Sequence, residues 1–108
     1  AAEQLRRNLR AAGAAHVKVR VADANELALP KPTQVVVLDP PRAGAAGACE
    51  KLAVVRPRRI VYVSCNPATL ARDLRGLAAV GYVVKAVELF ELFPQTSHVE
   101  TVVELART

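Results

Sequence analysis

Cys65 lies in a Ser-Cys-Asn sequence, residues 64–66, that directly follows a short apolar run. A thiolate adds readily to an electron-poor ring carbon, and a turn between a strand and the start of a helix favours the thiolate form. Cys65 is therefore a candidate nucleophile. The alternative is a buried structural cysteine, the common environment of a free cysteine. For Cys49, which falls inside a predicted helix, the structural role is the one we expect.

Asp39 is followed by two prolines and Arg42 in the sequence D-P-P-R. Each proline fixes its own φ and restricts the residue before it, so the Asp39 carboxylate has little freedom. Asp39 and Cys65 both stand where apolar strands end, which is the edge where open α/β sheets bind ligands. We therefore expect them to face one crevice, although a plain turn would also explain Asp39. Arg42 would contact a phosphate, brace Asp39 or form a surface ion pair.

Two further carboxylates stand beside predicted strands. Glu100 opens the last strand, close to His98, and either side chain there can act as a general base. The alternative for Glu100 is a surface charge. Asp23 follows an earlier predicted strand, where it would bind the polar edge of a nucleoside or cap a helix. Taken one residue at a time, the sequence does not decide between these alternatives.

The spacing of apolar residues predicts the elements that position these side chains. Helices are expected at Ala1–Ala12, at Gly47–Val55 and from Pro67 to about Gly81, the last of them capped by Asn66. Strands are expected at His16–Ala22, Val35–Leu38, Ile60–Val63, Tyr82–Phe90 and Val99–Ala106.

This order of elements matches the later part of a doubly wound α/β sheet. Val35–Leu38 and Ile60–Val63 are continuously apolar, as parallel strands buried on both faces are. We expect a mainly parallel sheet whose last strand runs antiparallel at an edge. No strand is followed by a G-x-G loop. Residues 1–108 are therefore predicted to form a partial domain whose glycine-rich front is missing, with an apolar sheet edge that drives self-association.

The composition narrows the class of protein. The chain has 108 residues, 52% of them hydrophobic, which suits one small domain with a single core. The net charge of +5 is compatible with RNA or any other polyanion. Cys49 and Cys65 have neither metal-site spacing nor a disulfide framework, so we expect no metal site and a reduced, cytoplasmic protein. No apolar run is long enough to cross a membrane.

Two long segments resemble the signatures of a known family. D-P-P-R-A-G at 39–44, together with I-V-Y-V-S-C-N-P-A-T at 60–69, is very similar to the first signature of the RNA 5-methyluridine methyltransferases. F-P-Q-T-S-H-V-E at 93–100 resembles the second. With the sequence between them they cover residues 35–108. One departure is Glu91, where the family usually has Asp.

The resemblance implies the C-terminal catalytic part of a Rossmann-like, class I methyltransferase fold that uses S-adenosylmethionine. In that family's reaction, Cys65 would add to carbon 6 of a uracil, and carbon 5 would take the methyl group. Glu100 would then remove the proton from carbon 5. Asp23 and Asp39 match positions that contact S-adenosylmethionine.

The resemblance also implies a loop beside the target base, in which Phe93, Pro94 and Gln95 would shape the pocket rather than react. The residues expected to bind the substrate RNA are Arg42, Asn66, Phe93, Gln95 and His98. The sequence at 42–47 and at Arg72-Asp73 looks most like the 23S ribosomal RNA branch, and the transfer RNA branch stays open. Family members commonly carry an N-terminal RNA-binding domain, and some carry an iron–sulfur cluster.

Three other functions are compatible with parts of the sequence. Amino-group methyltransferases use a D-P-P turn followed by an aromatic residue, where this chain has Arg42, and they would leave Cys65 idle. RNA cytosine-5 methyltransferases place a proline-cysteine pair after the turn, whereas Arg42 follows Pro41 here. A non-catalytic fragment or interaction module is the third alternative.

Overall fold

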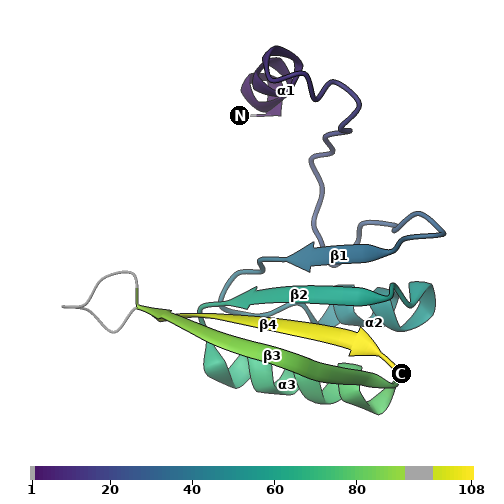
Figure 1. Ribbon diagram of the computed structural model, residues 1–108, viewed down its shortest axis with the longest axis vertical. Helices are drawn as coiled ribbons and strands as arrows, with labels where there is room; N and C mark the ends of the chain where they lie inside the picture. Colours follow the sequence, from purple (N-terminus) through teal and green to yellow (C-terminus); the bar gives the residue numbers. More distant parts are fainter. Residues whose placement is uncertain (1, 92–98) are drawn as a thin grey trace.

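The computed structural model describes residues 2–91 and 99–108, which form a four-stranded sheet with two helices against it and a third helix apart from it (Figure 1). The elements in chain order are α1 (Ala2–Ala11), β1 (Val35–Leu38), α2 (Ala46–Val55), β2 (Arg59–Ser64), α3 (Pro67–Ala79), β3 (Tyr82–Glu91) and β4 (Val99–Arg107). The strand order across the sheet is β1-β2-β4-β3.

The strand directions confirm an α/β sheet with an antiparallel last strand. β1 pairs with β2 in parallel, and β4 pairs antiparallel with both β2 and β3. It follows that β1, β2 and β3 all run the same way. The predicted edge position of the last strand is wrong, because β4 lies between β2 and β3.

Burial explains why β4 occupies the interior of the sheet. Val103 and Leu105 of β4 are 1% and 0% exposed, whereas β3 is exposed along almost its whole length. The β3–β4 register shifts between Val84 and Ala86, so Lys85 lies at an irregularity. A bulge and a lysine are features that protect an edge strand from pairing with another chain. β3 is thus the edge strand on this side.

The predicted strand at His16–Ala22 is not formed. Alternating apolar residues form a strand only where a neighbouring strand accepts their backbone hydrogen bonds, and no described strand lies beside this segment. Val21 is accordingly 82% exposed. The segment instead contacts α1, where the guanidinium of Arg6 donates to the carbonyl of Val19 at 3.2 Å.

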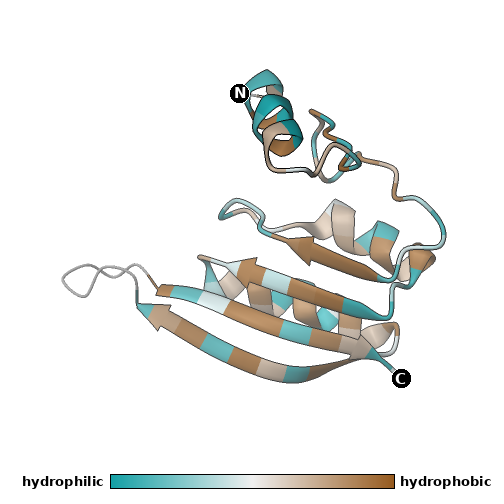
Figure 2. Ribbon diagram, turned by 45° about the horizontal axis from the view of Figure 1, so that its top comes forward, coloured by the Kyte–Doolittle hydropathy of each residue, from teal (hydrophilic) through white to brown (hydrophobic). Residues whose placement is uncertain are grey.

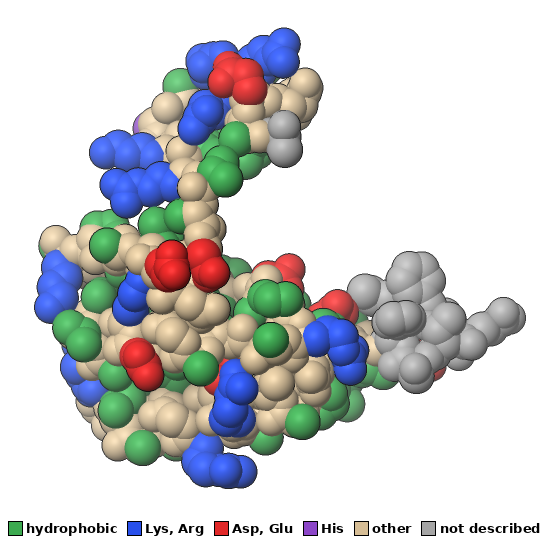
Figure 3. Space-filling view, turned by 180° about the vertical axis from the view of Figure 1, so that it is seen from behind, with side chains coloured by type: hydrophobic (Ala, Val, Ile, Leu, Met, Phe, Trp, Pro, Cys, Tyr) green, Lys and Arg blue, Asp and Glu red, His purple; other side chains and the backbone are tan. Residues whose placement is uncertain are grey.

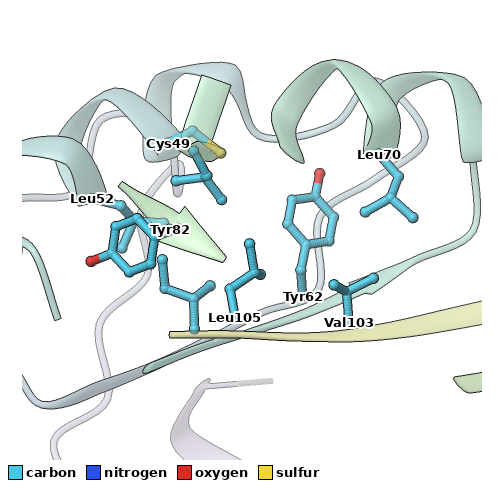
Figure 4. Close-up of a cluster of buried hydrophobic side chains, with 9 residues drawn as sticks. Cys49, Leu52, Tyr62, Leu70, Tyr82, Val103 and Leu105 are labelled. Atoms are coloured by element: carbon cyan, nitrogen blue, oxygen red, sulfur yellow. The ribbon is translucent and has the colours of Figure 1, made fainter. Parts of the chain in front are cut away.

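The core lies between the sheet and the two helices α2 and α3, which cover one face. Figure 2 shows that polar residues interrupt the apolar ones along β3 and β4, whereas β1 is apolar throughout. Side chains from strands and helices meet in one cluster (Figure 4) whose fully buried members include Leu52, Ile60, Tyr62 and Leu77. The core therefore fixes the strand β2 and the helices α2 and α3, and with them the ends of the two turns that follow β1 and β2.

The N-terminal helix α1 differs from α2 and α3 in its burial. None of the residues of α1 is buried, and lysine and arginine side chains gather on this part of the molecule (Figure 3). None of the described helices is both long and apolar enough to cross a membrane.

Candidate functional site

Three of the predicted site residues lie at one end of the sheet. Asp39 follows β1 and Cys65 follows β2, and the parallel pairing of these strands puts both at the same edge, as predicted. Glu100 is near the start of β4, which lies beside β2. Ser64 and Thr101 form the last pair of the β2–β4 ladder. Cys65 directly follows Ser64, and Glu100 directly precedes Thr101, so both residues lie just beyond this pair.

The turn that carries Cys65 is fixed by its neighbours on both sides. Ser64 and Asn66 exchange two hydrogen bonds of 3.0 Å, in which the Ser64 hydroxyl accepts from the Asn66 amide and donates to the Asn66 carbonyl. Asn66 then caps α3, because its side-chain oxygen accepts from the amide of Ala68 at 3.1 Å, and Pro67 opens the helix. The predicted cap is confirmed, and it leaves Cys65 half-buried at the helix start.

The turn after β1 is tied to the turn after β2. The side-chain amide of Asn66 and the hydroxyl of Thr69 both donate to the carbonyl of Arg42, each at 2.9 Å. The Arg42 guanidinium in turn lies 3.4 Å from the carbonyl oxygen of Cys65. Arg42 therefore braces the backbone of the candidate nucleophile, and among the described residues it forms no ion pair.

One oxygen of the Glu100 carboxylate has unusual surroundings. Its Oε2 atom is buried and has no hydrogen-bond partner among the described residues. A buried polar atom without a partner is rare in folded proteins and calls for an explanation. A carboxylate near the start of β4 is a candidate to accept a proton from a molecule bound at the strand ends.

Asp23 and Asp39 are placed differently. Asp39 is exposed at the end of β1. The carboxylate of Asp23 accepts from the amide of Asn25 at 2.8 Å, and the Asp23 carbonyl accepts from the amides of Glu26 and Leu27. Asp23 thus closes a turn, and the helix that it was predicted to cap is not formed, because residues 24–26 make only a turn before the chain extends again. Asn25 attaches the loop to α2, where its side-chain oxygen accepts from the amide of Ala48 at 3.0 Å.

Cys49 has the surroundings of a structural cysteine. It is 9% exposed within α2, and burial, followed by the nearby Asp73 carboxylate, raises the pKa of its thiol from 9.0 to about 12. A thiol held protonated at neutral pH is a poor nucleophile. Of the two cysteines, only Cys65 is placed for reaction with a bound molecule.

Asp73 is a buried polar residue for which the sequence predicted no structural role. It is 3% exposed and lies with Leu70 and Leu77 on the buried face of α3. The sequence does carry a signal for it, since a carboxylate at the spacing of buried leucines needs donors in the core. One of those donors is the hydroxyl of Tyr62, and burial together with this hydrogen bond raises the pKa of Tyr62.

The remaining predictions lie outside what the structure tests. Phe93, Gln95 and His98 fall within residues 92–98, outside the described residues. Both polar ends of the Asn66 side chain are engaged by protein groups, so its contact with a substrate stays a prediction.

Comparison with known proteins identifies a family and a similar relative. The family model described as tRNA (uracil-5-)-methyltransferase matches residues 18–108. The 23S rRNA (uracil(1939)-C(5))-methyltransferase of Photobacterium profundum is 49% identical over 71 residues, which is 66% of this chain and 15% of that protein. The chain therefore spans a small part of this relative.

Two solved structures resemble the fold. The tRNA (uracil-54, C5)-methyltransferase of Pyrococcus abyssi, in complex with S-adenosyl-L-homocysteine, superposes with a TM-score of 0.80 at 37% identity, covering 97% of this chain and 26% of that one. M1.HpyAVI superposes with a TM-score of 0.55 at 15% identity, covering 70% of this chain and 44% of that one, and shares the fold alone.

Proposed function

Because this chain belongs to the tRNA (uracil-5-)-methyltransferase family, we propose that it is the C-terminal catalytic part of a longer protein that methylates carbon 5 of a uridine in RNA. That longer protein is called the parent protein below. The observation that carries the proposal is the meeting of Cys65, Asp39 and Glu100 at one end of the sheet, with the Glu100 Oε2 atom buried and without a described partner.

Each of these residues has one task in the proposed reaction. The Cys65 sulfur forms a bond to carbon 6 of the uracil, which makes carbon 5 nucleophilic. S-adenosylmethionine, when bound, supplies the methyl group that carbon 5 takes. Glu100 then accepts the proton from carbon 5. The electron pair of that C–H bond re-forms the double bond between carbons 5 and 6 and expels the Cys65 thiolate, which gives 5-methyluridine and the free thiolate.

Asp39 and Asp23 are the residues proposed to hold the methyl donor. The exposed Asp39 carboxylate at the end of β1 fits a ligand with amino or hydroxyl donors. One oxygen of Asp23 is engaged with Asn25, and an ionised carboxylate can accept further hydrogen bonds. The S-adenosyl-L-homocysteine in the structure of the Pyrococcus relative supports a methyl donor of this class.

The proposed substrate is a uridine of 23S ribosomal RNA, with transfer RNA as the alternative. The ribosomal relative is 49% identical over its matched part and the transfer RNA relative 37% identical. The net charge of +5 suits either RNA. A stacked base cannot reach a pocket at the strand ends, so the target is expected in a loop or bulge. Arg42, Phe93, Gln95 and His98 are proposed to line the path of that base.

Two further features belong to this proposal. We place the parent protein in the cytoplasm, with its RNA. The 108-residue chain alone is proposed to self-associate, because β1 is an open edge strand in the described sheet and its residues Val35 and Val37 are 54% and 66% exposed. Sedimentation of the chain over a range of concentrations tests this, and a monomer at every concentration would contradict it.

The test of function uses the parent protein with S-adenosylmethionine and, in separate reactions, unmodified 23S ribosomal RNA and transfer RNA. Nucleoside analysis by mass spectrometry is expected to find 5-methyluridine in the ribosomal RNA. Formation in transfer RNA alone would correct the substrate. A methylated amino group on a base, with no 5-methyluridine, would contradict the proposed reaction.

A further inference from the structure

The carboxyl group of Asp73 lies in the core of the domain. Its Oδ2 atom accepts hydrogen bonds from the backbone amide of Ala45 at 2.8 Å and from the hydroxyl of Tyr62 at 2.5 Å. Its Oδ1 atom accepts from the Nε of Arg72 at 3.1 Å. A buried carboxylate is strongly destabilising unless donors surround it. One of these donors, the Ala45 amide, belongs to the turn after β1, so this hydrogen bond links the Asp73 carboxyl group to that turn.

Arg72 extends the contact along the same turn. Its Nη2 atom donates to the carbonyl of Ala43 at 2.9 Å and also lies 3.1 Å from the Asp73 Oδ1 atom. Gly44 sits between the two contacts, and a Cβ added there would lie 2.5 Å from the Arg72 Nη2 atom and 2.8 Å from the Asp73 Oδ2 atom. The Arg72–Asp73 pair therefore holds residues 43–45 closely.

The same face of α3 also holds Arg42, which comes directly before residues 43–45. Asn66 and Thr69 both bind the carbonyl of Arg42. Positions 66, 69 and 73 are separated by three and four residues, the spacing of one helical face. One polar stripe, starting next to Cys65, thus fixes the turn that follows Asp39.

We propose that Arg72 and Asp73 are positioning residues, which hold the turn at 42–45 against α3 and so fix Asp39 relative to Cys65. The inference rests on the proposed function, in which these two residues serve the methyl donor and the uracil. A misplacement of about 1 Å of reacting groups lowers a rate by on the order of 100-fold. Neither Arg72 nor Asp73 needs to touch a substrate for this effect.

The test compares two arginines of α3 in the parent protein. Arg72→Gln and Arg75→Gln each remove one positive charge from an exposed position of the same helix, but only Arg72 contacts the turn. Arg72→Gln is expected to lower kcat for 5-methyluridine formation by roughly 10- to 100-fold, and Arg75→Gln to leave kcat unchanged. Arg72→Lys, whose ammonium can still donate to the Ala43 carbonyl, is expected to recover part of the loss.

Tyr62→Phe separates positioning from stability. It removes a hydrogen bond to the same Asp73 carboxylate without touching the turn, so it is expected to lower Tm and keep kcat. A kcat loss in Tyr62→Phe equal to that in Arg72→Gln would overturn the proposal. So would an unchanged kcat in Arg72→Gln when the wild-type enzyme is active. An inactive wild-type enzyme would instead contradict the proposed function itself.

Discussion

The two cysteines of this chain lie in two regions with opposite properties. The region of Cys49 is the space between α2 and α3, where the thiol is 9% exposed and Asp73 is close. The region of Cys65 is the pair of turns at the ends of β1 and β2, where the thiol is half-buried beside a helix start and Glu100 stands at the next position of the register. One region is packed against the core, and the other opens at the sheet edge.

The difference teaches that position in the fold, and not residue type, determines how accessible each thiol is and how readily it can ionise. Around Cys49, burial and a nearby carboxylate both oppose formation of the thiolate. Around Cys65, the backbone is held by Asn66 and Arg42, while the side chain is left partly accessible. Asp73 belongs to both regions, since it faces Cys49 and binds the amide of Ala45 in the turn.

The largest expected effect contrasts the two thiols directly. In the parent protein, Cys65→Ala is expected to lower the rate of 5-methyluridine formation by roughly 10⁴-fold or more, because no group remains to bond carbon 6. Cys49→Ala is expected to keep the rate and to lose only about 1 kcal/mol of stability through lost packing. Methyl transfer assays and thermal melts of both variants measure this contrast. Equal rate losses in the two would refute it.

The next effect sharpens the description of the open region. Glu100→Gln keeps the shape of the side chain but removes its capacity to take a proton at the strand ends. The rate of 5-methyluridine formation is expected to fall by roughly 10²- to 10⁴-fold, whereas the Cys65 adduct is expected to form and to take the methyl group, because Glu100 acts only after methyl transfer. Single-turnover measurements separate the two steps. A wild-type rate in Glu100→Gln would assign the base to another residue.

A third effect contrasts glycines of the two regions. Gly44, in the turn, has a φ of +83° and no room for a Cβ, whereas Gly76, in α3, has no atom within 4 Å of an added Cβ. Gly44→Ala is expected to destabilise the 108-residue chain by about 1–3 kcal/mol. Gly76→Ala is expected to stabilise it by about 0.4–1 kcal/mol through helix propensity. Denaturant unfolding gives both values, and a tolerated Gly44→Ala would show that the turn is loosely held.

The smallest effect concerns pH and the closed region. The pKa of Cys49 is raised from 9.0 to about 12, so its contribution to stability is complete below pH 9.0 and is lost as pH rises toward 12. For one such proton the loss is at most about 1.4 kcal/mol per pH unit. Cys49→Ala is expected to show a shallower decline over this range. The decline does not vanish, because burial also raises the pKa of Tyr62 and Tyr82. An identical pH profile in Cys49→Ala would contradict this assignment.

What the sequence could predict is local. Asn66 and Pro67 define the start of α3 by themselves, so the turn around Cys65 was correct from the sequence, and the apolar run before Asp39 fixed the end of β1 in the same way. The strand at His16–Ala22 was wrong, since alternation describes one face of a strand and says nothing about whether a neighbour exists to pair with it.

What the sequence could not predict depends on contacts between distant segments. Glu100 lies at the same end of the sheet as Cys65 because β4 pairs with β2, and the apolar pattern of β4 does not reveal its neighbours. The structural role of Asp73 was missed because its donors, Ala45 and Tyr62, come from other parts of the chain. Side-chain spacing shows that a residue is buried, while its partners depend on the fold.

The most direct test of the central claim, that Cys65 is the thiol that attacks uridine, is to trap the bond it forms. The parent protein is incubated with S-adenosylmethionine and RNA that contains 5-fluorouridine, in which carbon 5 carries no proton for Glu100 to remove. Wild type and Cys49→Ala are predicted to give a protein–RNA adduct that survives denaturation, with the RNA attached to the peptide that contains Cys65, and Cys65→Ala is predicted to give none. An adduct that persists in Cys65→Ala, or no adduct in wild type with either RNA despite bound cofactor, would contradict the account.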